Sequence, residues 1–341
     1  MTVMTKSKVE LIKADQRNMK KEMTFKEAIR LGLLVKESKS IPCTFLYDTK
    51  GSQLFEDITE LEEYYPTRCE LQILQQRSTE IVGAVRDKGQ DDIVIVELGS
   101  GSSTKTRTLL RSFLSHFASV IYVPIEISES ILKESCDALS KEFPELHVIG
   151  FNGLYEQGLQ YVEEKYRDHP KLVCFLGGSI GNFTPDDAGK FLKELNQMMA
   201  PQDQLLVGID LHKDSETLER AYNDSRGVTA EFNLNLLHRM NAELGAHFNA
   251  ENFEHTSIYN VEQGRIEMWL RSLVNQQVRI GQLNATVELK KGEMIHTENS
   301  YKYRREQINR LADVSNFNVK HLWLDDNEMF TLSLFSVCHN N

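Results

Sequence analysis

Cysteine is sparse in this sequence and never forms a CxxC pair. The 341 residues contain five cysteines, which are scattered along the chain at Cys43, Cys69, Cys136, Cys174 and Cys338. An odd and dispersed set argues against a disulfide framework and against a zinc site. The ten histidines add no HExxH or similarly spaced pair, so we expect no metal ion. The pattern therefore predicts free thiols in a reducing compartment.

Long apolar runs are missing as well. No stretch approaches the ~20 apolar residues that span a membrane, and residues 1–23 lack the apolar core of a signal peptide. We therefore expect a cytoplasmic protein with no membrane partner. We also expect residues 1–16 to form a flexible tail.

An excess of positive charge is the third absence. The chain has 50 acidic and 39 basic residues, with a formal net charge of -11. Such a charge does not attract the phosphates of a nucleic acid. A small-molecule substrate fits this composition better, and we expect the chain to act on it as a monomer.

Alternating strand and helix patterns fill the middle of the chain. Apolar, β-branched runs that predict buried strands lie at 92–100, 119–128, 146–153 and 203–211, and residues 171–183 predict a strand followed by a loop. Segments with apolar residues at helical spacing lie between them, at 103–117, 131–143 and 186–199. This rhythm is typical of a parallel doubly wound sheet, which binds ligands at the carboxyl ends of its strands.

The pattern changes after Leu211. Residues 214–248 have helical spacing, residues 255–303 alternate like antiparallel strands, and residues 305–337 return to one helix and two strands. We therefore expect an α/β protein of two domains. A nucleotide-type domain spans 69–211 and 303–341, and an inserted α+β domain for the substrate spans 17–68 and 212–302.

The stretch VELGSGSSTKTRTLL, from Val96 to Leu110, resembles a phosphate-binding loop but fails both familiar tests. A P-loop needs glycine directly before its Lys-Ser/Thr pair, and Thr104 stands there. The dinucleotide fingerprint G-x-G-x-x-G needs a third glycine, and the same Thr104 occupies that place.

An acid at the end of each of two strands remains, with two glycines between them. Glu97 ends the first strand, Gly99 and Gly101 follow it, and Glu126 ends the second strand. Glycines let a bulky ligand approach the turn, and an acid at the second strand's tip can accept hydrogen bonds from ribose hydroxyls. This arrangement favours S-adenosylmethionine, while a nicotinamide cofactor and a plain tight turn stay open.

Several longer motifs resemble one family, the L-histidine Nα-methyltransferases of ergothioneine biosynthesis. They occur in the family's order between about Ile41 and Tyr303, as FLYDTKGSQLFEDITELEEYYPTRCELQIL, VELGSGSSTKT, FLGGSIGNFTP, AYNDSRGVTAEFN, RIEMWLRS and HTENSYKY. The resemblance implies a Rossmann-like class I methyltransferase sheet with an inserted α+β substrate-binding domain. It implies transfer of methyl groups from S-adenosylmethionine to the α-amine of histidine, three times in succession, giving hercynine and S-adenosylhomocysteine.

The resemblance also implies site residues. The cofactor site would include Gly99, Gly101, Lys105, Glu126, Leu154 and Tyr155. The histidine site would include Tyr64, Asn182, Tyr222, Met268, Glu298 and Ser300, with Phe55 beside them. Tyr47 and Tyr64 would be catalytic, as proton acceptors or orienting groups. The chain departs from the family at Leu154, where the family has an acid that holds the adenine amine, so we expect backbone groups to contribute more there.

Chemistry agrees with these residue types. Asn182 and Tyr222 can hydrogen-bond a carboxylate, while Glu298 and Ser300 can hold the two imidazole nitrogens. A different amino acid would leave Glu298 buried without a partner, at a cost of about 1–3 kcal/mol or more. Taken singly, each residue also has an ordinary structural explanation; Asn182, for example, could cap the helix that begins near Pro185. A methyltransferase for another amino acid and an inactive scaffold remain as alternatives.

Overall fold

The structure is a computed structural model that describes residues 9–14, 23–87 and 89–338. The chain divides into two compact units. The first comprises the described parts of Met1–Asn18, Arg68–Leu211 and Tyr303–Asn341, and the second those of Met19–Thr67 and His212–Lys302. The chain therefore leaves the first unit after Leu211 and returns to it at Tyr303.

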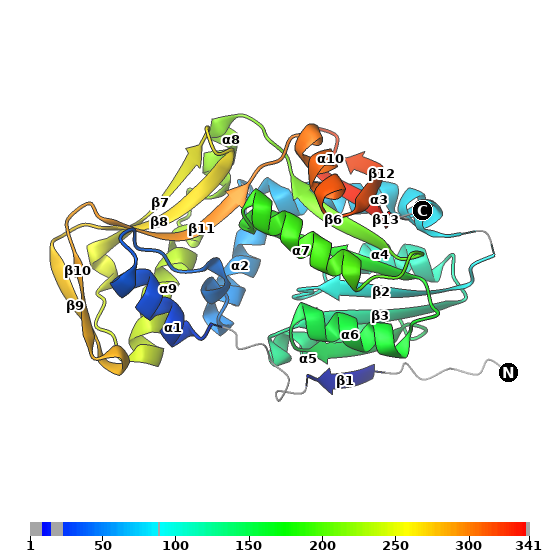
Figure 1. Ribbon diagram of the computed structural model, residues 1–341, viewed down its shortest axis with the longest axis horizontal. Helices are drawn as coiled ribbons and strands as arrows, with labels where there is room; N and C mark the ends of the chain where they lie inside the picture. The colour runs from blue at the N-terminus through cyan, green and yellow to red at the C-terminus, as the bar shows by residue number, and fades with distance from the viewer. Residues whose placement is uncertain (1–8, 15–22, 88, 339–341) are drawn as a thin grey trace. The chain divides into compact units, whose positions relative to one another are not determined.

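An eight-stranded sheet forms the centre of the first unit (Figure 1). Its strands, in spatial order, are β1 (Val9–Lys13), β4 (His147–Asn152), β3 (Ser119–Glu126), β2 (Asp92–Leu98), β5 (Lys171–Phe175), β6 (Gln204–Asp210), β13 (Phe330–Val337) and β12 (Phe317–Leu324). The first six run parallel, and β13 and β12 join antiparallel at one edge. From the boundary between β2 and β5, strands β2, β3 and β4 follow the chain in one spatial direction, and strands β5 and β6 follow it in the opposite spatial direction. Open α/β sheets bind ligands at such a switch point. The expected Rossmann-like, doubly wound sheet is confirmed.

Helices cover this sheet. They are α3 (Tyr65–Val85), α4 (Thr106–Leu114), α5 (Glu129–Glu142), α6 (Tyr155–Lys165), α7 (Pro185–Gln197) and α10 (Arg305–Val314). Figure 1 draws α6, α7 and α10 on the near side of the sheet, and α10 packs beside α7. Local signals set the helix starts: Thr184 accepts a hydrogen bond from the Asp187 amide at the N-terminus of α7, and Pro185 occupies its first turn. The final helix and two strands complete the sheet, as the sequence predicted.

The expectation of a flexible tail over residues 1–16 is wrong for residues 9–13. These residues form β1, which pairs in parallel with β4 at the sheet edge. The unpaired edge of β4 offers backbone donors and acceptors that a short extended segment can satisfy. Side chains add to this, because Lys13 pairs with Glu129 at 2.7 Å and Glu10 lies 3.3 Å from His147. The other residues of this range, except Ala14, lie outside the described parts.

The second unit is built on a three-stranded antiparallel sheet in the order β11 (Met294–Tyr301), β8 (Arg265–Ser272) and β7 (Phe253–Asn260). A separate hairpin pairs β9 (Gln276–Ile280) with β10 (Ala285–Leu289). The helices are α1 (Phe25–Arg30), α2 (Thr49–Thr59), α8 (Ser215–Ala221) and α9 (Val228–Leu244). The long helix α9 packs against α2 and against β7 and β8. Asp48 begins α2 by accepting the Gly51 amide at 2.7 Å, and it also accepts from Asn235 of α9 at 2.8 Å.

All five cysteines are free thiols, which confirms that part of the prediction. Among the described residues, none of the helices has both the length and the apolar character that crossing a bilayer requires.

Candidate functional site

Two glycines shape the loop after β2. Gly99 and Gly101 have φ values of 68° and 51°, a region that favours glycine. A Cβ atom at Gly99 would lie 2.8 Å from the hydroxyl of Tyr155, so the backbone and this ring approach each other closely. The loop therefore depends on glycine at this position for both backbone conformation and space.

Glu126, at the end of β3, faces this loop. One carboxylate oxygen accepts the Gly101 amide at 3.1 Å, and the other accepts the Ser128 amide at 2.9 Å. Each oxygen of an ionised carboxylate has a further lone pair. The half-buried carboxylate is thus held by two backbone amides and can still accept hydrogen bonds from a ligand's hydroxyls.

Glu97 supports the loop from below. Its buried carboxyl accepts hydrogen bonds from Thr106 at 2.6 Å and from Tyr122. Burial raises the pKa of Glu97 to about 7, although these two hydrogen bonds oppose the rise. Glu97 therefore ties the end of β2 to the start of α4 and to β3, which is a structural role.

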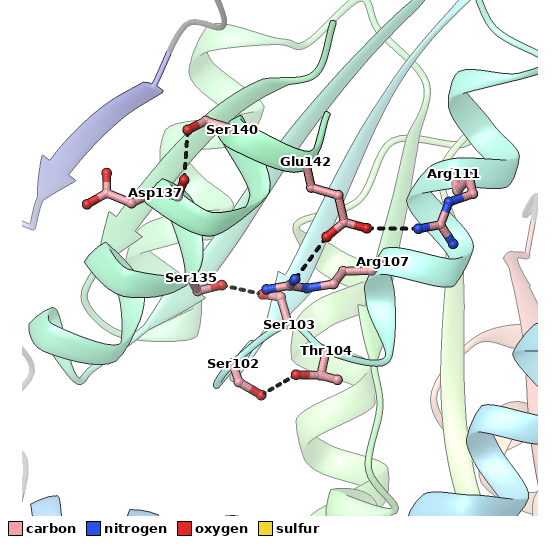
Figure 2. A network of polar contacts seen from close by, with 9 residues as sticks. All are labelled: Ser102, Ser103, Thr104, Arg107, Arg111, Ser135, Asp137, Ser140 and Glu142. Atoms are coloured by element: carbon pink, nitrogen blue, oxygen red, sulfur yellow. Dashed lines mark hydrogen bonds and ion pairs between the residues drawn. The ribbon is translucent and has the colours of Figure 1, made fainter. Parts of the chain in front are cut away.

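Hydroxyl and charged side chains fasten the rest of the loop to α5 (Figure 2). Ser103 lies 2.9 Å from Ser135, and Ser102 lies 2.9 Å from Thr104. One turn further on, Glu142 pairs with both Arg107 and Arg111, at 2.9 and 2.8 Å. Ser103 therefore links the loop to α5, and Glu142 links α5 to α4.

A buried carboxylate that the sequence did not single out lies beside the predicted cofactor residue Lys105. Glu70 of α3 is fully buried, and it pairs with the Lys105 ammonium. The Gly177 amide donates to the same carboxylate, at 2.8 and 3.1 Å to its two oxygens. A side chain at Gly208 would collide with Glu70. The only sequence signal was an acid inside a helix that otherwise looked ordinary, in the segment CELQIL.

Leu154 and Tyr155 begin α6. The Leu154 amide donates to the Gln157 side chain at 3.1 Å, so this backbone donor is already engaged. Tyr155 packs between Phe175 and Phe191, with ring centroids 6.2 Å from each. Burial raises the pKa of Tyr155 to about 12. Its hydroxyl stays protonated and can donate beside Gly99.

Asn182 belongs to the first unit, whereas the other predicted histidine-binding residues belong to the second. It ends a short 3₁₀ helix, Ser179–Asn182, and its side chain is half-buried. Thr184 caps α7, so the ordinary explanation of Asn182 as that helix's cap is wrong.

Five aromatic rings gather in the second unit. Tyr47 packs edge-on against Phe55 and Phe232, each at 5.4 Å between centroids. Tyr64 lies 6.2 Å from Phe55 and 6.0 Å from Tyr222. Four of the predicted residues are therefore brought together on elements that are distant in sequence, with Phe232 of α9 added by the fold.

Glu298 lies on β11 among these groups and is 7% exposed. Its Oε2 atom has no hydrogen-bond partner among the described residues. Burial raises the pKa of Glu298 to about 7, and the Lys302 ammonium opposes the rise. A buried carboxylate oxygen without a donor is costly unless a ligand supplies one.

A β-bulge decides which way Glu298 points. The register of β11 against β8 shifts between His296 and Glu298, so that they oppose the neighbouring residues Trp269 and Met268. His296 therefore points to the opposite face, where it contacts Asn299 at 2.8 Å. The buried Met268 stands directly across from Glu298, as the resemblance implied for its neighbourhood.

The hydroxyl of Tyr47 is a poor proton acceptor in this setting. Burial raises its pKa well above the usual value, and the negative charge of Glu298 raises it further, followed by Cys43, Tyr64 and Tyr222. A phenol of this kind remains protonated near neutral pH. It can orient an amine or a water molecule, which favours the orienting role over the base.

Ser300 and Tyr222 form a hydrogen-bonded pair, and a lysine that sequence reasoning missed completes it. Their hydroxyls lie 2.8 Å apart. The Lys302 ammonium donates to Ser300 at 2.8 Å and to Tyr222 at 3.0 Å. The signal for Lys302 was present, because it continues the two-residue spacing of Glu298 and Ser300 along the strand.

The described residues do not form a metal centre. Within residues 9–14, 23–87 and 89–338, no group of three or more His, Cys, Asp or Glu side chains has a geometry that could hold a metal ion. The candidate site is instead two clusters, a glycine-bounded carboxylate in the first unit and an aromatic cluster with Glu298 in the second.

Several known proteins are similar to this chain over most of its length. A family model described as a histidine-specific, SAM-dependent methyltransferase matches residues 25–337. A histidine N-alpha-methyltransferase from Mycobacterium tuberculosis is 40% identical over 88% of this chain and 91% of its own length. The ergothioneine biosynthesis protein 1 of Neurospora crassa is 30% identical over 85% of this chain but only 32% of its own length. An L-tryptophan methyltransferase from Psilocybe serbica is 27% identical over 86% of this chain and 87% of its own.

The family model covers more than half of the chain, and the matched residues 25–337 include parts of both compact units. The chain is an enzyme that belongs to the histidine-specific, S-adenosylmethionine-dependent methyltransferases.

Proposed function

We propose that this enzyme transfers methyl groups from S-adenosylmethionine to the α-amino nitrogen of L-histidine. The observation that carries the proposal is Glu298, a buried carboxylate with an oxygen that lacks a donor, among aromatic rings in the second unit. An imidazole N–H supplies the missing donor, and imidazole is the ring that can also carry a positive charge opposite this carboxylate near neutral pH. The match to the histidine-specific family supports the same substrate.

The first unit would bind the methyl donor. Glycines at 99 and 101 leave space for a bulky ligand, and Glu126 keeps free lone pairs for ribose hydroxyls. Lys105 and Tyr155 flank this loop, and Leu154 stands where the family has an acid. S-adenosylmethionine, when bound, supplies a sulfonium-activated methyl group. The residues fit it, and they belong to the sheet edge that this fold uses for ligands.

The second unit would bind most of the histidine. Glu298 and Ser300 would hold the imidazole, and Tyr222 together with Asn182 would bind the carboxylate. Tyr47 and Tyr64 would orient the α-amine. A small fraction of this amine is deprotonated near neutral pH, and binding of that form leaves alignment, rather than a strong base, as the main contribution.

We further propose three successive methylations, giving hercynine for ergothioneine biosynthesis. Repeated transfer needs a neighbour that yields as methyl groups accumulate, and Met268, with its flexible thioether, stands across from Glu298. A cytoplasmic monomer acting on this small molecule completes the proposal. The ergothioneine protein of Neurospora crassa, similar over 85% of this chain, supports the pathway.

The test is a mass-spectrometric methylation assay with purified enzyme, S-adenosylmethionine and each of the twenty amino acids in turn. We expect mass gains of one, two and three methyl groups on histidine alone. Accumulation of the singly methylated product would contradict the trimethylation but leave the substrate unchanged. No mass gain on histidine would overturn the proposal.

A methyltransferase for another amino acid is the second candidate. The similarity to an L-tryptophan methyltransferase over 86% of this chain favours it. Tryptophan also offers one ring N–H, but its larger ring would have to fit beside Glu298 and Met268. The same assay separates the two, because tryptophan and histidine are offered separately.

A further inference from the structure

Lys302 is buried, with 3% of its surface exposed, and its ammonium lies beside side chains of the proposed histidine site. Its Nζ atom lies 2.8 Å from the Ser300 hydroxyl and 3.0 Å from the Tyr222 hydroxyl. The ammonium also stands 4.6 Å from the centroid of the Tyr222 ring. One cation therefore contacts two residues of the proposed histidine site at once.

The position of Lys302 follows from the strand. Side chains two residues apart lie on the same face of a β-strand. Glu298 and Ser300 share a face of β11 beyond its bulge, and Lys302 directly follows the strand with the same spacing. The contact between Lys302 and Ser300 shows that this row continues past the end of the strand.

The ammonium of Lys302 restricts how the two hydroxyl groups can be oriented. An ammonium donates and never accepts, so the oxygens of Tyr222 and Ser300 both act as acceptors toward Lys302. The bond between the two hydroxyls uses one of their two hydrogens. The hydrogens of both hydroxyls must therefore point away from the ammonium. Lys302 thereby restricts the orientation of the Tyr222 and Ser300 hydroxyls.

Charge points the same way. A buried ammonium costs free energy, and an apolar side chain of similar volume often serves stability equally well or better. The carboxylate of Glu298 and the carboxylate of a bound amino acid are both negative. The Lys302 ammonium offsets part of this negative charge. The site would then contain one positively charged side chain, Lys302, and one negatively charged side chain, Glu298. An amino acid substrate also carries one charge of each sign.

We infer that Lys302 is a positioning residue of the histidine site, which orients the hydroxyls of Tyr222 and Ser300 and supplies the positive charge that the substrate carboxylate needs. This inference rests on the proposed function. Lys302 acts through Tyr222 and Ser300 and takes no part in the chemical step. Its loss should therefore weaken histidine binding more than it slows methyl transfer.

The experiment compares Lys302→Met, Lys302→Gln and Lys302→Arg with the wild-type enzyme in steady-state methylation of L-histidine. We expect the KM for histidine to rise about tenfold or more in the Met and Gln variants, the effect of losing a charged hydrogen bond. The KM for S-adenosylmethionine should not change, and kcat should change less than the KM for histidine. Lys302→Arg, which keeps the charge, should recover part of the loss. Lys291→Met, at an exposed turn of the same unit, is the matched control.

A double-mutant cycle separates positioning from general damage. In a Tyr222→Phe background the hydroxyl on which Lys302 acts is gone, so Lys302→Met should add much less than it does in the wild type. The melting temperatures of all variants are measured in parallel. Should Lys302→Met fail to fold, Lys302→Gln and Lys302→Arg give the same comparison.

The outcomes keep the two claims apart. No turnover of histidine by the wild-type enzyme overturns the proposed function and, with it, the basis of the inference. Normal histidine turnover with an unchanged KM in folded Lys302→Met or Lys302→Gln overturns only the role of Lys302. Equal rises in the KM for both substrates, or full additivity with Tyr222→Phe, would also overturn it.

Discussion

The two clusters of the candidate site are built from different materials. In the first unit, backbone amides of Gly101, Ser128 and Gly177 hold two carboxylates, and glycines provide the space. In the second unit, buried side chains form the cluster, and Glu298 and Lys302 lie among aromatic rings. A backbone-built cluster suits a cofactor that many enzymes share, whereas a side-chain cluster can be specific for one substrate.

This difference predicts that the two clusters can be damaged separately. Substitutions in the glycine-loop cluster of the first unit should change the KM for S-adenosylmethionine, and those in the aromatic cluster around Glu298 should change the KM for histidine. The following variants test that separation.

The largest effect is expected for Glu298→Gln. The amide is similar in size but carries no charge, so the imidazole loses a charged hydrogen bond worth about 1.5–3 kcal/mol. We expect kcat/KM for histidine to fall by roughly one to two decades, with little change in the KM for S-adenosylmethionine. Initial rates measured over both substrates check this, with the exposed Glu288→Gln as control. An equal loss of kcat/KM for both substrates would contradict the separation of the two clusters.

Gly99→Ala should have the next largest effect, on the other substrate. The added Cβ would meet the Tyr155 hydroxyl at 2.8 Å, and φ of 68° costs a non-glycine residue about 1–2 kcal/mol. We expect the KM for S-adenosylmethionine to rise about tenfold. Gly83→Ala, in a helix with nothing within 4 Å of the new atom, should leave both KM values unchanged and raise the melting temperature slightly. A normal cofactor KM in Gly99→Ala would remove this loop from the cofactor site.

Leu154→Asp should improve cofactor binding by a smaller amount. The substitution restores the acid that the resemblance places at the adenine amine, and one hydrogen bond contributes about 0.5–1.5 kcal/mol. We expect the KM for S-adenosylmethionine to fall roughly threefold to tenfold, with the KM for histidine unchanged. Aspartate also favours the N-cap position that Leu154 occupies on α6, so the melting temperature is measured alongside. A higher cofactor KM would place the adenine elsewhere.

The last prediction concerns stability and pH and leaves both KM values aside. The pKa of Glu298 is about 7 in the folded enzyme and near 4.5 when exposed, so between these values the folded state binds more protons than the unfolded state. Stability therefore falls as pH rises through this window. Glu298→Gln removes this contribution, so its melting temperature relative to the wild type should be higher at pH 8 than at pH 5. Thermal unfolding without ligands measures this, and the opposite trend would contradict the raised pKa.

Much of the first unit could be predicted from its sequence. Strands such as Asp92–Leu98 are continuous apolar runs because both faces of the parallel sheet are covered, and the helices between them have clear spacing. The two glycines and Glu126 were visible because a turn with left-handed backbone angles and an acid at a strand end leave local signals. β1 was missed, because its short segment gains structure only by pairing with β4.

The second cluster was harder to predict without the resemblance. Glu298 and Ser300 look like any alternating strand face, and the bulge that turns His296 away depends on pairing with β8. The role of Glu70 depends on Lys105 and Gly177, which are 35 and 107 residues distant in sequence. Long-range contacts of this kind leave no local pattern.

A competition assay tests whether Glu298 selects histidine. Wild-type enzyme and Glu298→Gln are each given S-adenosylmethionine and an equimolar mixture of the twenty amino acids, and mass spectrometry records which become methylated. The account predicts methylated histidine alone for the wild type, and a preference for histidine that falls by one to two decades in Glu298→Gln. An unchanged preference in the variant, or methylation of another amino acid by the wild type, would contradict it.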